Sequence, residues 1–204
     1  MNTRTRAWVV SLANAFGMIG VVSFPAIAPE LQMEWGLSNT EVGWLGGVYF
    51  AGYVAGVPIL TGLTDRMEAR HIVLFGYLVS AIASAGFGLL ADDLWSATIW
   101  RFLAGLGFAG SYMPAMKALS DAASPRHRHA AVSIYSASFS IGVSISYLGT
   151  GWLSAWTGWQ AAFVLLSILP LLSCLAVCFS LPLSGRAVSR GMPDFRGALR
   201  NRRA

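Results

Sequence analysis

The stretch WRFLAGLGFAG, residues 100–110, decides the fold class because it places a charged side chain inside a long apolar segment. An arginine at the centre of a bilayer costs at least about 2.5–3.5 kcal/mol. We therefore expect Arg101 to face protein or water rather than lipid. If the segment is helical, Gly105, Phe108 and Tyr112 share a face with this arginine.

The opposite face of the same helix carries Gly107 and Gly110, which would let a neighbouring backbone approach closely. We favour the interpretation that the arginine face borders a cavity inside the protein. The alternative is that Arg101 snorkels, or pairs with a carbonyl, near the outer surface, because Trp95 lies only six residues away.

The composition indicates a membrane protein with several spans. Hydrophobic residues make up 55% of the chain and charged residues 11%, against about 25% charged residues in soluble domains. The net charge of +5 does not indicate nucleic-acid binding, because the basic residues lie in loops and in the tail. Cys174 and Cys178 have no His or carboxylate near them in sequence, so we expect no metal site and no cofactor.

Six apolar segments predict an all-α integral membrane protein, with a six-transmembrane-helix bundle over residues 1–182. The predicted spans are residues 7–28, 41–63, 72–91, 95–116, 130–152 and 160–181. A signal peptide is the weaker interpretation of the first segment, because five comparable segments follow it. Residues 183–204 form a basic segment, which we interpret as a cytoplasmic tail.

The charges predict the orientation of these spans. With the N-terminus inside, thirteen of the fourteen Lys and Arg residues fall on the cytoplasmic side, and Arg101 is the remaining one. The outer loops carry acidic residues instead, including Glu30, Glu34 and Glu41 in the first loop. We therefore expect a multi-pass protein of the plasma membrane, the inner membrane in bacteria, with both termini in the cytoplasm.

Local patterns add predictions about helix ends and helix contacts. Residues 37–41, LSNTE, resemble a helix start. Gly52 and Gly56 are four residues apart in the second span and can form a ridge for close helix contact. Pro170 lies in the middle of the sixth span and should kink it.

Polar residues inside the spans are candidates for a solute cavity. Ser140 and Ser144 share one face of the fifth span, and small residues occupy the other face, so this helix should lie inside the bundle. Asn14 either lines a cavity or makes an interhelical hydrogen bond. Tyr49 and Tyr53 share a face of the second span and are interpreted as packing residues rather than solute ligands.

Two stretches match the patterns of a known family. The loop after the second span follows Gly-x-Leu-Ala-Asp-Arg-x-Gly-Arg-Arg at four positions: Leu63, Asp65, Arg66 and Arg70. The departures from this pattern include Thr61, Glu68 and Ala69. The fourth span follows Arg-x-x-Gln-Gly-x-Gly at Arg101, Gly105 and Gly107, with Ala104 in place of the Gln. The chain thus resembles the major facilitator superfamily of secondary transporters over about residues 7–182.

This resemblance implies two inverted three-helix repeats that form one half of a twelve-span transporter fold. Solutes would bind near the membrane midplane between the halves, and rocking would expose the site to each side in turn. The implied partners are the lipid bilayer, a small-molecule solute and a second six-span half, supplied by the same protein or by another copy. The chain covers only one such half, so the alternatives are a truncated product or a half that assembles.

The resemblance also implies a conformational switch in the loop that contains Leu63, Asp65, Arg66 and Arg70. Asp65 would meet a helix terminus of the second half, and the two arginines would pair with Asp121 across the inner surface. The alternative is that these charges only fix the topology.

The predicted function is secondary active transport of a small solute, and Arg101 favours an organic or inorganic anion. The candidate cavity residues are Arg101, Gly105, Tyr112, Asn14, Ser140 and Ser144. A non-transporting membrane subunit that keeps the half-fold is the alternative. An intramembrane enzyme is not expected, because all three histidines lie in or beside cytoplasmic loops.

Overall fold

The computed structural model describes residues 3–18 and 23–180, and each regular element within these ranges is an α-helix. The eight helices are α1 (Thr3–Gly17), α2 (Ser23–Trp35), α3 (Asn39–Leu63), α4 (Ala69–Leu90), α5 (Leu94–Ala122), α6 (Arg128–Thr157), α7 (Trp159–Leu166) and α8 (Ile168–Ser180). α1 and α2 together take the place of the first predicted span, and α7 and α8 take the place of the sixth. The predicted tail lies outside the described residues.

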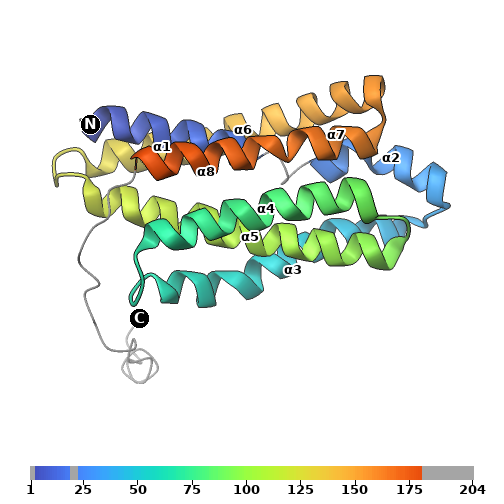
Figure 1. Ribbon diagram of the computed structural model, residues 1–204, viewed down its shortest axis with the longest axis horizontal. Helices are drawn as coiled ribbons and strands as arrows, with labels where there is room; N and C mark the ends of the chain where they lie inside the picture. The colour runs from blue at the N-terminus through green and yellow to red at the C-terminus, as the bar shows by residue number, and fades with distance from the viewer. Residues whose placement is uncertain (1–2, 19–22, 181–204) are drawn as a thin grey trace, which may run out of the picture.

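The helices run along the long axis of the molecule and are connected alternately at its two ends (Figure 1). The α3–α4 and α5–α6 connections lie at the end where α1 begins. The α2–α3, α4–α5 and α6–α7 connections lie at the opposite end. This is the up-and-down order that the charge distribution requires.

The contacts between helices are symmetric with respect to the two halves of the bundle. α3 packs on α5, and α1 packs on α6; α4 packs on α5, and α1 packs on α8. The first three spans correspond to α1–α4 and the last three to α5–α8. If each span is exchanged with its counterpart in the other half, the α3–α5 contact becomes the α1–α6 contact, and the α4–α5 contact becomes the α1–α8 contact. The pattern is therefore the one expected of two inverted three-helix repeats, and the predicted fold class is confirmed.

A glycine ridge brings α3 and α5 into close contact. A Cβ atom at Gly52 would overlap the carbonyl group of Phe102, and one at Gly56 would lie 2.8 Å from the Cβ of Ala109. No larger side chain fits at Gly52 without separating the helices, because the neighbouring atom belongs to the backbone. The ridge predicted for the second span is thus confirmed.

The opposite face of α5 makes a similar contact with α4. A Cβ atom at Gly110 would lie 3.0 Å from the Cα of Gly76, and one at Gly107 would lie 2.6 Å from the backbone nitrogen of Ser80. The prediction that these glycines admit a neighbouring backbone is confirmed. α5 is therefore held between α3 and α4, with Arg101 on the α3 side.

Two helices begin with reciprocal capping. The Ser38 side chain accepts a hydrogen bond from the Glu41 backbone at 3.3 Å, and the Glu41 carboxylate accepts one from the Ser38 backbone at 2.8 Å. The helix start predicted at residues 37–41 is thus present. Asp93 and Ser96 make an equivalent capping box at the start of α5.

The first outer loop is shorter than predicted, because Glu30 and Glu34 lie on α2 rather than in a loop. The Ser154 hydroxyl donates to Glu30 at 2.8 Å, and the Trp159 indole donates to Glu34 at 2.7 Å. These donors come from α6 and α7 and satisfy the two carboxylates. The helix continues past the end of its apolar run to Trp35, and Gly36, with a φ of 64°, follows its last residue.

The fourth span is also longer than predicted, because α5 continues to Ala122 and carries Lys117 and Asp121 as helical residues. Among the described helices, four are long and apolar enough to cross a bilayer by themselves: α3, α4, α6 and α7 joined with α8. α5 has 29 residues but contains charged side chains, and residues 19–22 of the first span lie outside the described ranges. The count of six spans therefore stays a prediction.

The sixth span is interrupted at Ser167, between α7 and α8. The interruption lies three residues before Pro170, which has no N–H group to donate to the carbonyl of Leu166. The structure thus places a break where the sequence predicts a kink.

Candidate functional site

Arg101 is buried where α2, α3 and α5 meet, and only 2% of its surface is exposed. Its Nε–H group donates to the carbonyl oxygen of Leu45 at 3.2 Å. Its guanidinium lies 4.7 Å from the ring centre of Tyr49 and 5.0 Å from that of Phe24. The carbonyl partner considered as the alternative is therefore observed, and two aromatic faces add cation–π stabilisation.

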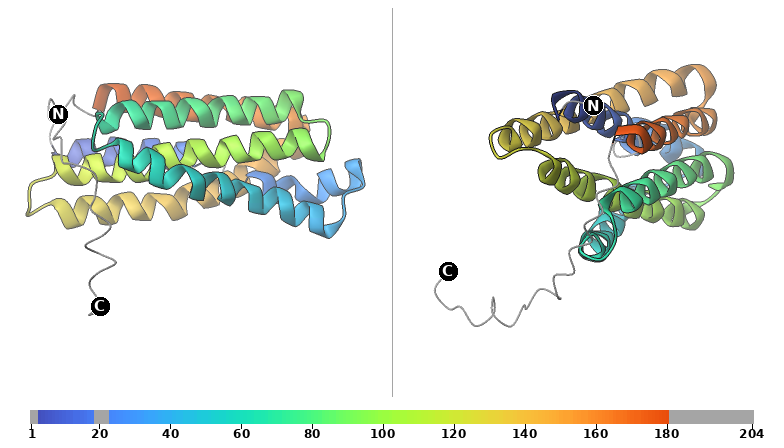
Figure 2. Two further views of the ribbon diagram at one scale, coloured as in Figure 1. Left: turned by 90° about the horizontal axis from the view of Figure 1, so that it is seen from below. Right: turned by 60° about the vertical axis from the view of Figure 1, so that its left-hand side comes forward.

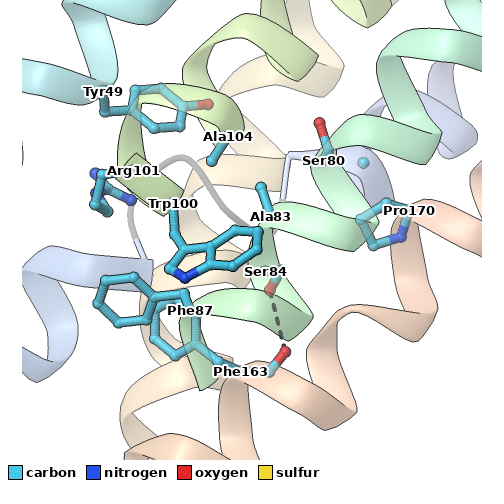
Figure 3. Close-up of a pocket in the computed structure, with 11 residues that line it drawn as sticks. Tyr49, Ser80, Ala83, Ser84, Phe87, Trp100, Arg101, Ala104, Phe163 and Pro170 are labelled. Atoms are coloured by element: carbon cyan, nitrogen blue, oxygen red, sulfur yellow. Dashed lines mark hydrogen bonds between the residues drawn. The ribbon is translucent and has the colours of Figure 1, made fainter. Parts of the chain in front are cut away.

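A small cavity also borders Arg101, at the level where helices of both repeats meet (Figure 3). Its volume is about 20 Å³, which is room for one water molecule. Tyr49, Ser80 and Trp100 are among its lining residues, and the Ser84 hydroxyl beside it donates to the carbonyl of Phe163 at 3.1 Å. This cavity is too small for an organic solute, so a solute must bind on another surface or after a rearrangement.

Asn14 makes interhelical hydrogen bonds. Its amide nitrogen donates to Ser138 at 2.9 Å, and its carbonyl oxygen accepts from the Tyr135 hydroxyl at 3.0 Å. The side chain is 2% exposed, and both partners lie on α6. Of the two interpretations of Asn14, the structure shows the interhelical bond.

Gly105 does not line a cavity in this structure, because a Cβ atom there would overlap the carbonyl of Tyr49 on α3. Its role is helix contact. Tyr112 is partly buried, and its ring stacks on Tyr135 with a centroid distance of 5.5 Å. The face shared by Arg101, Gly105 and Tyr112 therefore divides into a packed part near α3 and a half-open part further along α5.

Ser140 and Ser144 are exposed on α6, and the Ser144 hydroxyl donates to the Ser140 carbonyl within the helix. The other face of α6 carries the buried serines Ser138 and Ser146 and packs against α1 and α2. The prediction that α6 has small or polar residues on both faces is correct, but only one of the faces lies inside this bundle.

The loop between α3 and α4 is linked to α5 through Lys117. The Lys117 ammonium lies 2.7 Å from the Asp65 carboxylate and donates to the Thr64 hydroxyl at the same distance. Both charged side chains are more than a third exposed, so this ion pair contributes at most about 1 kcal/mol. Its importance is geometric, because it joins the loop to the C-terminal part of α5.

The predicted pairing of Arg66 and Arg70 with Asp121 is not found among the described residues. Arg70 lies on α4 and donates to the carbonyl of Cys178 on α8 at 2.7 Å. Asp121 is exposed on the last turn of α5. The reason is helix length: because α5 continues past residue 117, Lys117 faces the loop and Asp121 lies one turn further on.

Three residues of the site were missed in the sequence. Phe24 gave no signal, because a single aromatic residue in an apolar run has no distinctive pattern. Lys117 was placed in a loop, although its position opposite a loop that carries Asp65 was a usable signal. Phe139 lies on α6 beside Phe108 and Tyr112, a neighbourhood that only the tertiary fold creates.

A bundle of inverted helix repeats with glycine ridges and a deeply buried arginine is a type of structure found among polytopic membrane transporters. This chain belongs to the Major Facilitator Superfamily, whose family model matches residues 8–203.

The chain is similar to known carriers of this family. It is 30% identical to a candidate niacin/nicotinamide transporter of Bacillus subtilis (strain 168), over 74% of this chain and 37% of the relative. It is also 30% identical to the 4-hydroxybenzoate transporter of Acinetobacter baylyi, over 78% of this chain and 35% of the relative. The chain thus spans little more than a third of the length of these relatives.

A solved structure supports the same fold. The inward-facing, unoccupied crystal structure of a bacterial homolog of the human lysosomal transporter Spinster superimposes with a TM-score of 0.75. The sequence identity is 22%, and the match covers 96% of this chain and 47% of that one.

Proposed function

We propose that this chain supplies one half of a secondary transporter that moves a small organic anion across the bacterial inner membrane by alternating access. The observation that supports the proposal most strongly is the burial of the cationic Arg101 inside the helix bundle. The chain also belongs to a family of known transporters. The relative from Acinetobacter baylyi, whose solute is 4-hydroxybenzoate, supports a carboxylate as the transported group. These relatives are transporters, which argues against an enzyme.

Arg101 is suited to bind an anion in one state and to release it in another. In the present arrangement it donates to the Leu45 carbonyl and lies against two aromatic rings. A carboxylate makes a stronger, charge-assisted hydrogen bond to a guanidinium than a carbonyl does. Exchange of the Leu45 carbonyl for a solute carboxylate would give the two states different affinities, which alternating access requires.

The second half of the transporter is proposed to cover α3 and α6. At Gly43, Gly46 and Gly47 of α3, and at Gly149 and Gly151 of α6, no atom of the described residues outside the local helix lies within 4 Å of the position that a Cβ atom would take. α3 and α6 lie along the same edge of the bundle when it is viewed from below (Figure 2). Open glycines on both helices suit close packing against another helical half.

Asp65 and Lys117 are proposed to act in the switch between states, together with Leu63, Arg66 and Arg70. The pair joins the α3–α4 loop to α5 at the inner end of the bundle in this structure. Asp65 would meet a helix N-terminus of the second half in the opposite state. The α5 residue in this proposal is therefore Lys117, which pairs with Asp65, and not Asp121, which was expected to pair with the two arginines.

The proposed function is tested by the Arg101→Gln variant in proteoliposomes, with uptake of benzoate and of the neutral benzamide measured side by side. Loss of a charge-assisted hydrogen bond should lower benzoate uptake by about ten- to a hundredfold and leave benzamide uptake unchanged. Arg126→Gln, the same change at an exposed loop position, is the matched control. Equal loss for both solutes, or no loss for benzoate, would remove the anion role of Arg101.

A further inference from the structure

A cluster of aromatic rings from three helices continues from the arginine site along α5, and we name it the Phe108 cluster. Phe108 lies at its centre and is 6% exposed. The ring centre of Tyr53 on α3 is 4.9 Å away, and that of Tyr112 on α5 is 5.3 Å away. Phe139 on α6 completes the cluster, with its ring 5.6 Å from Tyr112. These distances lie in the range of favourable ring–ring contacts.

The Phe108 cluster is connected to Arg101 through a single ring. Tyr49 has its ring centre 4.7 Å from the guanidinium and 6.2 Å from the Phe108 ring. Arg101 and Phe108 are two helical turns apart on one face of α5, which is about 10 Å along the axis. An arginine side chain and a one-ring carboxylate together can cover this distance.

The helices between residues 3 and 180 that the structure describes leave the rim of the cluster open. Tyr53, Tyr112 and Phe139 are each only partly buried. Ser136, one turn before Phe139 on α6, and Ser140, the residue directly after it, are exposed. The rim therefore presents ring surface together with tyrosine and serine hydroxyls, which suits a flat ligand with a polar substituent.

We propose that the Phe108 cluster is a platform on which the ring of a planar aromatic carboxylate stacks while Arg101 binds its carboxylate. This inference rests on the proposed function and narrows the organic anion to an aromatic one. Stacking between aromatic rings strengthens an interaction by about two- to tenfold beyond the burial of the same area. The platform therefore selects for the flat ring, and Arg101 selects for the charge.

The test compares two ligands that carry the same charge but differ in their ring. Benzoate and cyclohexanecarboxylate are similar in size, and only benzoate has a π face. Affinities of the purified chain for each are measured by calorimetry in detergent. We expect benzoate to bind about two- to tenfold more tightly than cyclohexanecarboxylate.

Two variants on different helices test whether the cluster causes this preference. Phe139→Leu on α6 and Tyr53→Leu on α3 each remove one ring and keep an apolar side chain. Each variant should bring the ratio of the affinities for benzoate and cyclohexanecarboxylate close to one. Phe179→Leu, at a position on α8 that is 88% exposed, is the control and should leave this ratio unchanged. Because the two positions lie on different helices, a folding defect in one variant still leaves the other to decide.

A neutral pair of ligands separates this inference from the proposed function. Arg101→Gln should weaken the binding of both acids equally and leave the preference for benzamide over cyclohexanecarboxamide unchanged. If the variant weakens the binding of neither acid but still prefers benzamide among the amides, Arg101 does not bind the anion, and the Phe108 cluster is still a stacking platform. The proposed platform is overturned if the parent chain binds the aromatic ligand no more tightly than the cyclohexane ligand, both among the acids and among the amides. It is also overturned if Phe139→Leu and Tyr53→Leu both keep the same preference for benzoate as the Phe179→Leu control.

Discussion

Arg101 shows how one charged residue is accommodated in an apolar bundle. Burial of an uncompensated cation would be very unfavourable. The structure supplies a backbone carbonyl from α3 and the π faces of Phe24 and Tyr49 within 5.0 Å. These groups stabilise the cation without neutralising it, so a carboxylate that replaces the carbonyl would still gain a strong interaction.

Glycine residues determine how closely the helices around Arg101 can pack. Gly76 is one clear case, because a Cβ atom there would lie 2.5 Å from the carbonyl carbon of Gly110. We expect Gly76→Ala to destabilise the fold by about 1–3 kcal/mol, since α4 and α5 must separate to admit the methyl group. Thermal unfolding in detergent measures the effect.

Gly43→Ala is the matched control for this prediction, because a Cβ atom at Gly43 has no neighbour within 4 Å. Alanine is also the better helix former, so the control should be neutral or slightly stabilising. If the two variants unfold at the same temperature, the α4–α5 contact is not as close as described.

α5 is the element on which the site depends. It packs against α3 on one face and α4 on the other, and it carries Arg101, Phe108 and Lys117 along its length. Its start is fixed by Asp93, whose carboxylate accepts from the Ser96 backbone at 2.7 Å. The cap fixes where the helix begins, and the glycine contacts with α3 and α4 hold the face on which Arg101 lies.

The cap of α5 makes the stability of this element depend on pH. Hydrogen bonds from the Ser96 side chain and backbone hold the pKa of the Asp93 carboxyl below its ordinary value of 3.8. A lowered folded-state pKa means that the stabilisation is fully present above the unfolded-state pKa and is lost as the pH falls through the folded-state value. Asp93→Ala should therefore lower the unfolding temperature at neutral pH.

The difference in unfolding temperature between Asp93→Ala and the parent chain should shrink at pH values below about 4. Asp121→Ala, at an exposed position near the other end of α5, is the control and should show no such trend. A difference that stays constant down to the lowest accessible pH would contradict the role of the carboxylate in the cap.

Much of the element structure could be predicted because it depends on local patterns. The capping residues Ser38 and Glu41, the ridge of Gly52 and Gly56, and the break before Pro170 are each readable within one helix. Helix ends were less predictable where polar residues continue a helix beyond its apolar run. α2 continues to Trp35, where Gly36 follows with a φ of 64°, and donors from α6 and α7 bind its two carboxylates.

The site itself was predicted only in part, because periodicity gives the face of a residue but not the helix that it meets. The face of Arg101 was correct, yet its contacts with Leu45 and Phe24 come from two other helices. Gly105 was assigned to a cavity and instead contacts α3, since small size suits both roles. The Asp65–Lys117 pair depends on the actual length of α5.

At the scale of the whole molecule, the bundle has one closed side and one open side. The closed side holds Asn14 and the buried serines between α1, α2 and α6. The open side carries the glycines of α3, the exposed serines of α6 and the rim of the Phe108 cluster. A second six-helix half on this open side would enclose a path bordered by Arg101 and the aromatic rim, which is the central claim.

The most direct test of this claim is thiol labelling in membrane vesicles, with Cys174 and Cys178 replaced by alanine. A membrane-impermeant maleimide should label Ser140→Cys on the open side of α6, and benzoate should slow the reaction. Leu172→Cys, on the exposed apolar face of α8 near the middle of the predicted sixth span, should remain unlabelled in lipid. If Ser140→Cys is labelled no faster than Leu172→Cys, no aqueous path borders this face, and the proposed transport pathway is contradicted.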